Sequence, residues 1–459
     1  MSAERAPVAE ALAAAVERGR ALPVPPEVRE TCERLLVDVG GLCVAARAAP
    51  YVRAAIGTWD APGDATAIGH ARALDAAGAA FVNGTAAHGE DYDDTFEGGP
   101  VHAGSVIVPA LLATAERHRI SGGDLLYGMA VGLEVTCRAS LVAPKRIHQA
   151  GFHPTAILGA MGAAAGVAAA LRASTAQFAS AQGIAGSFAG GLIEYLAEGT
   201  STKRLHPGWA AQSGIRAVEL ARAGFDGPRT VWEGTHGLLQ GFANTTQGDW
   251  GKLLERFGER WVAPTIAFKP YACGTMIHPY IDCARRISLA LGRQPGRGLD
   301  EIVAIECDTA EGIVHRLWEP LAAKRNPANG YAAKFSVPYC VAHALAHGAV
   351  GLGAFGDGPV DPRVAALAAK VGYRVDPGNP YPDEFTGHVR VRFADGAVAE
   401  ERQPHLRGGR REPLSRGDIE EKFLANCTRG DWPAARARQW LAFARGAFAG
   451  PIDLTPFRG

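Results

Sequence analysis

The chain has 459 residues, which is enough for two or three ordinary domains, and its 47 Lys and Arg residues balance 47 Asp and Glu residues. A formal charge of zero argues against the basic surface that nucleic-acid binding requires and against the polybasic segment that an anionic membrane attracts. With 47% hydrophobic and 20% charged residues, the composition is typical of a soluble globular protein. We therefore expect no nucleic-acid partner and no membrane association.

The first 260 residues have a helical pattern of apolar positions. We predict helices over residues 6–20, 27–47, 105–119, 123–138, 154–171, 175–186 and 208–223. Ser174 and Gln177 have the spacing of a capping box. Residues 154–171 carry no charge but are mainly alanine and glycine, so we predict a buried core helix rather than a membrane span.

The pattern changes after about residue 265. Residues 303–307 and 389–393 alternate as half-buried strands do, and Asp395-Gly396 suits a hairpin turn into Val398. Further helices are predicted over 279–292, 338–348, 361–371, 418–427 and 433–446. We therefore predict a mainly α protein: a large helical domain built from residues 1–265 and 406–459, with a smaller α/β domain over 266–405 inserted into it.

The eight cysteines are scattered, and no pair has the Cys-x-x-Cys spacing of a zinc ribbon or a clustered iron–sulfur motif. We expect reduced and mostly buried thiols, as in cytoplasmic proteins. The first residues lack the apolar segment of a signal peptide, which also favours a cytoplasmic location.

The densest polar cluster runs from His88 to Thr95, includes Asp91, Asp93 and Asp94, and is followed by His102. It has three interpretations. It could be a solvated acidic turn, or a metal site, although its spacing matches no closed zinc or EF-hand pattern. It could also be a buried hydrogen-bond network that orients His102.

Three His-Pro dipeptides begin at His153, His206 and His278, each before a helical pattern. Proline suits the first helical position, which places each histidine at the N-cap beside free backbone N–H groups. That location favours a neutral imidazole that can act as a base. A simple cap is the alternative for any one of them, but three together favour an anion-binding pocket.

Two lysine segments precede His-Pro pairs: Lys203-Arg204 lies before His206, and Lys269 lies nine residues before His278. Either lysine could bind a carboxylate or be an ordinary surface group. His343 and His347 lie four apart on one helical face, but the glutamate of a His-Glu-x-x-His site is missing, so packing is favoured.

These segments together resemble the MmgE/PrpD family, whose activities include 2-methylcitrate dehydration, cis-aconitate decarboxylation and iminodisuccinate epimerisation. The resemblance rests on residues 88–95 with His102, on 151–155, 203–208 and 269–278, and on 333–340, in family order. It implies a helical domain with an α/β lid, a cleft between them, a homodimer, and catalysis without metal, iron–sulfur cluster or nucleotide.

The resemblance also implies that Asp91, Thr95, His102, His153, Lys203 and Lys269 lie in the active site. We assign catalytic roles to His102, His153, Asp91 and Lys203, and substrate binding to Thr95, Lys269, Arg204 and His278. Three positions depart from the family: Ala103-Gly104-Ser105 follows His102, Cys273-Gly274 replaces a segment in which the decarboxylases have a further histidine, and Phe152 replaces the epimerase tyrosine.

The predicted function is that of a lyase removing a proton next to a carboxylate, with loss of water from a 2-methylcitrate-like or other small di- or tricarboxylate. One histidine would remove the α-proton, the other would protonate the departing hydroxyl, and Asp91 would orient His102. Which histidine is the base stays open. The alternatives are an isomerase or epimerase, a decarboxylase, or a non-catalytic carboxylate-binding protein.

Overall fold

The computed structural model describes residues 6–292, 298–356 and 358–459, which form two compact units. The first, here called the helical unit, runs to Ala267 and resumes over Ser415–Gly459. The second, here called the sheet unit, is Phe268–Leu414. The fold class is mainly α, as predicted.

The helical unit is built from helices that vary from one turn to six. Its helices are α1 (Val8–Gly19), α2 (Pro26–Ala46), α3 (Pro50–Gly57), α4 (Ala76–His88), α5 (Gly104–His118), α6 (Gly122–Ser140), α7 (Arg146–Gln149), α8 (Pro154–Ala170), α9 (Thr175–Phe188), α10 (Tyr195–Glu198), α11 (His206–Arg222), α12 (Leu238–Ala243), α13 (Trp250–Leu254), α20 (Arg416–Arg429) and α21 (Ala434–Gly446). Two short antiparallel pairs accompany them: β1 (Ala65–Thr66) with β2 (Ala73–Leu74), and β3 (Thr95–Phe96) with β4 (Ile266–Ala267).

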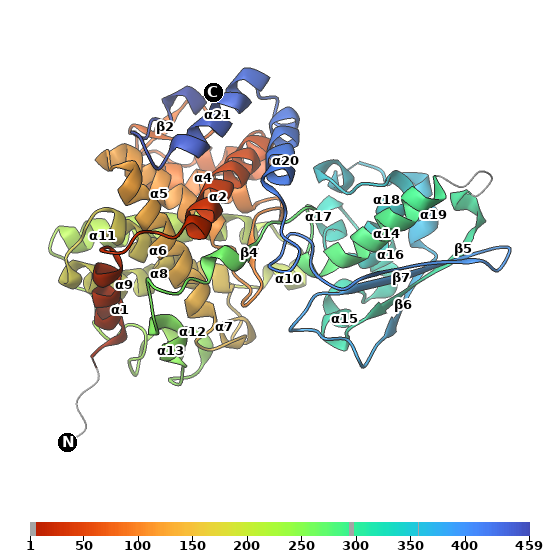
Figure 1. The fold of residues 1–459 in the computed structure, drawn as a ribbon, viewed down its shortest axis with the longest axis horizontal. Helices are drawn as coiled ribbons and strands as arrows, with labels where there is room; N and C mark the ends of the chain where they lie inside the picture. Colours follow the sequence, from red (N-terminus) through yellow and green to blue (C-terminus); the bar gives the residue numbers. More distant parts are fainter. Residues whose placement is uncertain (1–5, 293–297, 357) are drawn as a thin grey trace. The chain divides into compact units, whose positions relative to one another are not determined.

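Helix α8 is the core of the helical unit, because all 17 of its residues are buried among α5, α6, α9 and α11 (Figure 1). Its small residues let neighbouring helices come close. A Cβ on Gly162 would lie 1.9 Å from Thr136 Oγ1 of α6, and one on Gly214 of α11 would lie 2.4 Å from Ala163 Cβ. The predicted buried core helix is confirmed.

In the described part of the chain, no single helix is long and apolar enough to cross a membrane. The bent pair α2 and α3 passes the same test by length and composition only.

Helix α20 packs against α2 (Figure 1). Its Lys422 ammonium lies 2.7 Å from Asp38 Oδ1 of α2, and both side chains are almost fully buried. The same ammonium donates to the backbone carbonyl of Tyr92 at 2.6 Å and lies 3.9 Å from the centre of the Tyr92 ring. Helix α20 therefore contacts the acidic turn that follows α4 through Lys422.

The sheet unit has a four-stranded mixed sheet. The strands are β5 (Ile302–Thr309), β6 (Val371–Val375), β7 (Gly387–Phe393) and β8 (Val398–Gln403), in the order β6-β5-β7-β8. Strand β6 is parallel to β5, while β5–β7 and β7–β8 are antiparallel. The predicted hairpin turn at Asp395-Gly396 joins β7 to β8, with Gly396 at φ 85°.

Helix α14 (His278–Leu291) packs against β7, β8 and α18 (Val337–His347), and Figure 1 shows α14, α18 and α19 on one side of the sheet. The other helices are α15 (Glu311–Leu317), α16 (Leu321–Arg325), α17 (Gly330–Ala333) and α19 (Pro362–Ala368). Every helix predicted from periodicity is present, although α19 ends three residues early. The Ser174–Gln177 capping box and the burial of all eight cysteines are also confirmed.

Candidate active site

The acidic turn after α4 is buried. The exposed fractions of Asp91, Asp93 and Asp94 are 2%, 0% and 0%, and that of His88 at the end of α4 is 1%. The interpretation as a solvated turn is therefore wrong, since water does not reach these carboxylates. They form a network held by hydrogen bonds and a cation, as buried charges must be.

Each carboxylate of the turn has a different partner. Asp93 Oδ2 lies 2.7 Å from His88 Nδ1, and Asp94 Oδ2 accepts from the Gly104 backbone N–H at 3.0 Å. Asp91 has a left-handed backbone, φ 52°, and its carboxylate accepts a hydrogen bond from the Lys203 ammonium. Lys203 is itself buried, in the turn η1 (Thr202–Leu205) before α11, so this is a buried ion pair.

Gly104 explains the unusual sequence after His102. A Cβ at this position would lie 2.4 Å from Asp94 Oδ1 and 2.6 Å from the Leu35 side chain. The missing side chain therefore lets the Asp94 carboxylate reach the start of α5, where a negative charge is favourable.

The ring of His102 is held by backbone rather than by Asp91. Its Nδ1 lies 2.7 Å from the Asp94 carbonyl oxygen and 3.6 Å from Asp93 Oδ1, and its backbone N–H donates to Thr155 Oγ1 at 3.1 Å. The prediction that Asp91 orients His102 is therefore wrong, because the Asp91 carboxylate pairs with Lys203 instead. A carbonyl oxygen can only accept, so His102 Nδ1 carries a proton and, in the neutral ring, Nε2 is the unprotonated nitrogen.

His153 is the N-cap residue of α8, as predicted, and its backbone N–H donates to the Gly191 carbonyl at 2.9 Å. Its ring centre lies 5.8 Å from that of His88 and 6.2 Å from that of His102. Burial lowers the pKa of His153 well below its ordinary value, and the nearby positive groups, His88 and Lys203 first, lower it further. His153 is therefore a neutral imidazole near pH 7.

The N-cap prediction is wrong for the other two His-Pro pairs. His206 and His278 are the first residues of α11 and α14, and the N-caps are Leu205 and Ile277. In both cases a 3₁₀ turn precedes the helix and extends the helical backbone by one residue.

Arg204 follows Lys203 in the sequence, Thr95 follows Asp94, and both residues have structural contacts. The Arg204 guanidinium carbon lies 4.6 Å from the centre of the Tyr51 ring. Thr95 is buried in β3, where it pairs with Ala267. These contacts provide local packing for both side chains.

Lys269 and His278 belong to the sheet unit, and both are buried, at 2% and 0% exposure. His278 Nε2 lies 3.2 Å from the Cys273 carbonyl oxygen, and the Lys269 charge acts on the Cys273 thiol. Burial alone would raise the pKa of Cys273, but hydrogen bonds from Cys340 and His278 and the charge of Lys269 lower it overall. Cys273 thus links two predicted binding residues of this unit.

His88, Asp93 and His102 could offer three metal-ligand atoms, all within 4.8 Å of one another. However, His88 Nδ1 and Asp93 Oδ2 are 2.7 Å apart, whereas two ligands of a tetrahedral zinc are about 3.3 Å apart, given bonds of about 2.0 Å. These two atoms are therefore hydrogen-bonded to each other and do not share one metal ion. His343 and His347 have separate partners, the Ala349 carbonyl and Asp361.

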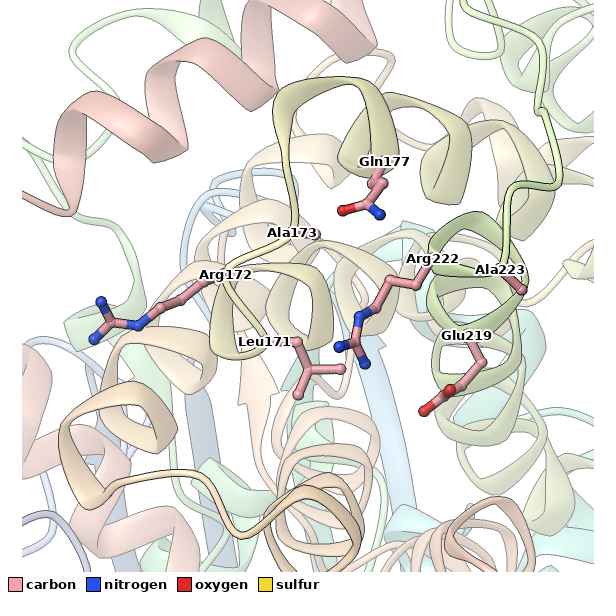
Figure 2. Close-up of a pocket in the computed structure, with 7 residues that line it drawn as sticks. All are labelled: Leu171, Arg172, Ala173, Gln177, Glu219, Arg222 and Ala223. Carbon is pink, nitrogen blue, oxygen red and sulfur yellow. The ribbon is translucent and has the colours of Figure 1, made fainter.

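The hollow in Figure 2 is separate from the histidine cluster. It has a volume of about 440 Å³ and is lined by Leu171, Arg172, Ala173, Gln177, Glu219, Arg222 and Ala223. Its α11 residues are at the end of that helix, whereas His206 begins it, and a helix of 17 residues is about 25 Å long.

The predicted site residues did not include His88, His206 or Tyr195, which surround the predicted histidines. His206 Nδ1 lies 3.1 Å from His153 Nδ1, and the Tyr195 ring centre lies 6.2 Å from that of His153. His206 carried a signal in its His-Pro pair. Tyr195 carried none, because it lies in a short helix 42 residues beyond His153 in the sequence.

Comparisons with known proteins identify the family of the chain. Residues 10–250 match the MmgE/PrpD N-terminal domain and residues 271–443 match the MmgE/PrpD C-terminal domain. The chain is 31% identical over 367 residues to cis-aconitate decarboxylase of Homo sapiens, covering 76% of this chain and 72% of the relative. It is 28% identical over 434 residues to cis-aconitate decarboxylase of Aspergillus terreus, covering 87% and 85%. The chain belongs to the MmgE/PrpD family.

Proposed function

We propose that the protein is a lyase that acts on a small di- or tricarboxylate by acid–base catalysis at a carbon next to a carboxylate. The observation that carries this proposal is the placement of His102 and His153 in one buried cluster, with ring centres 6.2 Å apart, beside the Lys203–Asp91 pair. Such a reaction needs a base at the carbon, a proton donor for the leaving group, and cations for the charge that develops on the carboxylate.

The hydrogen bonds of this cluster support distinct roles. His102 suits the base, because its Nδ1 keeps its proton towards the Asp94 carbonyl and its Nε2 is therefore the nitrogen that takes up a proton. His153 then serves as a hydrogen-bond donor to the leaving group. Lys203 has three N–H groups, so it can hold Asp91 and also bind a substrate carboxylate, and the N-terminus of α8 adds a positive dipole.

In the dehydration that we favour, His102 takes the α-proton and the C–H electron pair becomes the new C=C bond. The C–O bond breaks, and the hydroxyl, held by a hydrogen bond from the His153 N–H, leaves as water with a proton from solvent. His102 releases the α-proton to solvent, which restores its neutral ring.

Decarboxylation is the second candidate, because the relatives reported above are named cis-aconitate decarboxylases. In that reaction a C–C bond breaks, CO₂ leaves, and the electron pair that stays on the substrate takes a proton from the donor. Cys273-Gly274, where the family's decarboxylases have a further histidine, argues for dehydration instead.

The test is a panel of acids, including 2-methylcitrate, citrate and cis-aconitate, incubated with the enzyme in D₂O and followed by NMR. A new alkene with loss of water supports dehydration, and release of CO₂ supports decarboxylation. Exchange of the α-proton without conversion would indicate an isomerase. Thermal stabilisation by an acid without any reaction would favour a carboxylate-binding protein and contradict catalysis.

The same assay tests metal independence. Activity should survive EDTA, since His88 and Asp93 are hydrogen-bonded to each other rather than spaced as ligands. Activity that a chelator abolishes and added metal restores would contradict this part of the proposal.

The family resemblance further supports a lid role for the sheet unit and a homodimer in solution. Lys269→Met should then raise KM more than it lowers kcat, and light scattering should give twice the 48.1 kDa mass of the chain. An unchanged KM or a monomeric mass would contradict the corresponding statement.

A further inference from the structure

The rings of His153 and His206 are in hydrogen-bond contact, and this contact determines which nitrogen of each ring carries the proton. Their Nδ1 atoms lie 3.1 Å apart, and each side chain is 5% exposed. A neutral imidazole has one N–H and one lone pair, so one Nδ1 must donate and the other must accept. The donor ring then has a bare Nε2, and the acceptor ring has its proton on Nε2.

Both rings are neutral near pH 7. Burial lowers the pKa of His206 to about 4, with His88 and Lys203 adding to the effect, and the pKa of His153 is lowered well below its ordinary value for the same reasons. The charged and titratable groups acting on His153 are His88, Lys203, His206 and His102, and all of them disfavour a second proton.

The contact is built by the backbone. His153 caps α8 and His206 begins α11, and these two helices pack closely through small residues such as Gly214. Gly191, whose carbonyl accepts from the His153 N–H, leaves room for the second ring, because a Cβ there would lie 3.2 Å from His206 Nδ1 and 2.5 Å from Ala156 Cβ. Three segments of the chain, at His153, Gly191 and His206, therefore hold the two rings at this distance.

We propose that His206 is a positioning residue whose Nδ1–H donates to His153 Nδ1 and so keeps the His153 proton on Nε2. The inference rests on the proposed lyase function, in which His102 is the base and a second group must donate. In this arrangement His102 has its proton on Nδ1, which faces a carbonyl, and His153 has its proton on Nε2, because its Nδ1 accepts from His206. A neutral imidazole at a helix N-terminus can then act as a hydrogen-bond donor to a substrate oxygen.

Two variants of nearly the same size separate a donor from an acceptor at this position. The side-chain amide of His206→Asn can still donate to His153 Nδ1, whereas the carboxylate of His206→Asp can only accept. His206→Asp should therefore force the His153 proton onto Nδ1. His236→Asn, at an exposed histidine, is the control for the substitution itself.

The first measurement is ¹⁵N NMR of histidine-labelled protein without substrate, with His153 assigned from its own variant. We expect the proton of His153 on Nε2 in the wild type and in His206→Asn, and on Nδ1 in His206→Asp. A wild-type His153 with its proton on Nδ1, or a tautomer that His206→Asp leaves unchanged, would overturn the proposal.

The second measurement is turnover of whichever acid the panel identifies. His206→Asn should keep kcat within about 10-fold, and His206→Asp should lower kcat by about 100-fold, with a smaller change in KM. Equal losses in the two variants would indicate a structural role and contradict the proposal. If no acid is turned over, the lyase function fails while the NMR result still decides the role of His206.

Discussion

The Nδ1 atom of His102 lies 2.7 Å from the backbone carbonyl oxygen of Asp94, eight residues earlier in the chain. The carboxylate of the same aspartate accepts from the Gly104 N–H at the start of α5. One residue thus fixes both the tautomer of the histidine and the beginning of the helix that follows it. The orientation of the His102 ring depends on a backbone carbonyl, and a substitution of the Asp94 side chain leaves that carbonyl in place.

Replacing either central histidine should stop catalysis. His102→Ala and His153→Ala are each expected to lower kcat by about 100-fold or more, the usual contribution of a positioned acid or base. The measurement is kcat on the acid found by the panel, with circular dichroism to confirm folding. Wild-type turnover in both variants would remove the basis for the acid–base assignment.

The Lys203–Asp91 pair should matter for stability as well as for binding. Lys203→Met leaves a buried carboxylate without its cation and should lower the free energy of unfolding by about 3–5 kcal/mol. Adding Asp91→Asn to this variant should recover much of the loss, because no unpaired charge then remains. Urea denaturation gives the free energies of unfolding of the wild type, Lys203→Met and the double variant. If all three were equally stable, the ion pair would contribute little to stability.

Gly104 should tolerate no side chain. Gly104→Ala places a Cβ against Asp94 and Leu35 and should destabilise the protein by about 1–3 kcal/mol, with a further loss of activity as the Asp94 carboxylate is displaced. Gly241→Ala in α12 is the matched control, because nothing lies within 4 Å of its Cβ and alanine favours a helix. Thermal unfolding of both variants provides the comparison, and a Gly104→Ala protein as stable as the control would contradict it.

Stability should fall in mild acid because of His206 and His153. The pKa of His206 is about 4 in the folded protein and about 6.5 when unfolded, so the unfolded chain binds the proton first. The stability that this group provides is complete above pH 6.5 and is lost as the pH falls towards 4. His206→Asn should therefore flatten the dependence of Tm on pH over this range, and an unchanged slope would show that other groups control it.

Much of the fold could be predicted from local patterns. The helix at 154–171 and the hairpin after Val389 are confirmed because apolar spacing and turn residues determine them. Helix α4 was missed because nearly every residue in it is buried, so its sequence has no alternation between an apolar and a polar face. Strand β6 was missed because its partner β5 is more than 60 residues away and the pairing is parallel.

The sequence was enough to predict which residues form the candidate site, but not which of them contact each other. The His-Pro pairs and the acidic cluster identified the residues, but Asp91 was assigned to His102 because the two are close in sequence. In the structure Asp91 contacts Lys203, 112 residues away. That pairing depends on how α4 and α11 pack, which no local pattern encodes.

Lys422 of α20 donates to the carbonyl of Tyr92, 330 residues earlier, and pairs with Asp38. When the first 400 residues have been synthesised, all histidines of the cluster are therefore present, but Lys422, which contacts the acidic turn, is not. Asp38 lacks its Lys422 partner until α20 has been synthesised. The contact between Lys422 and the acidic turn can therefore form only after residue 422 has been synthesised.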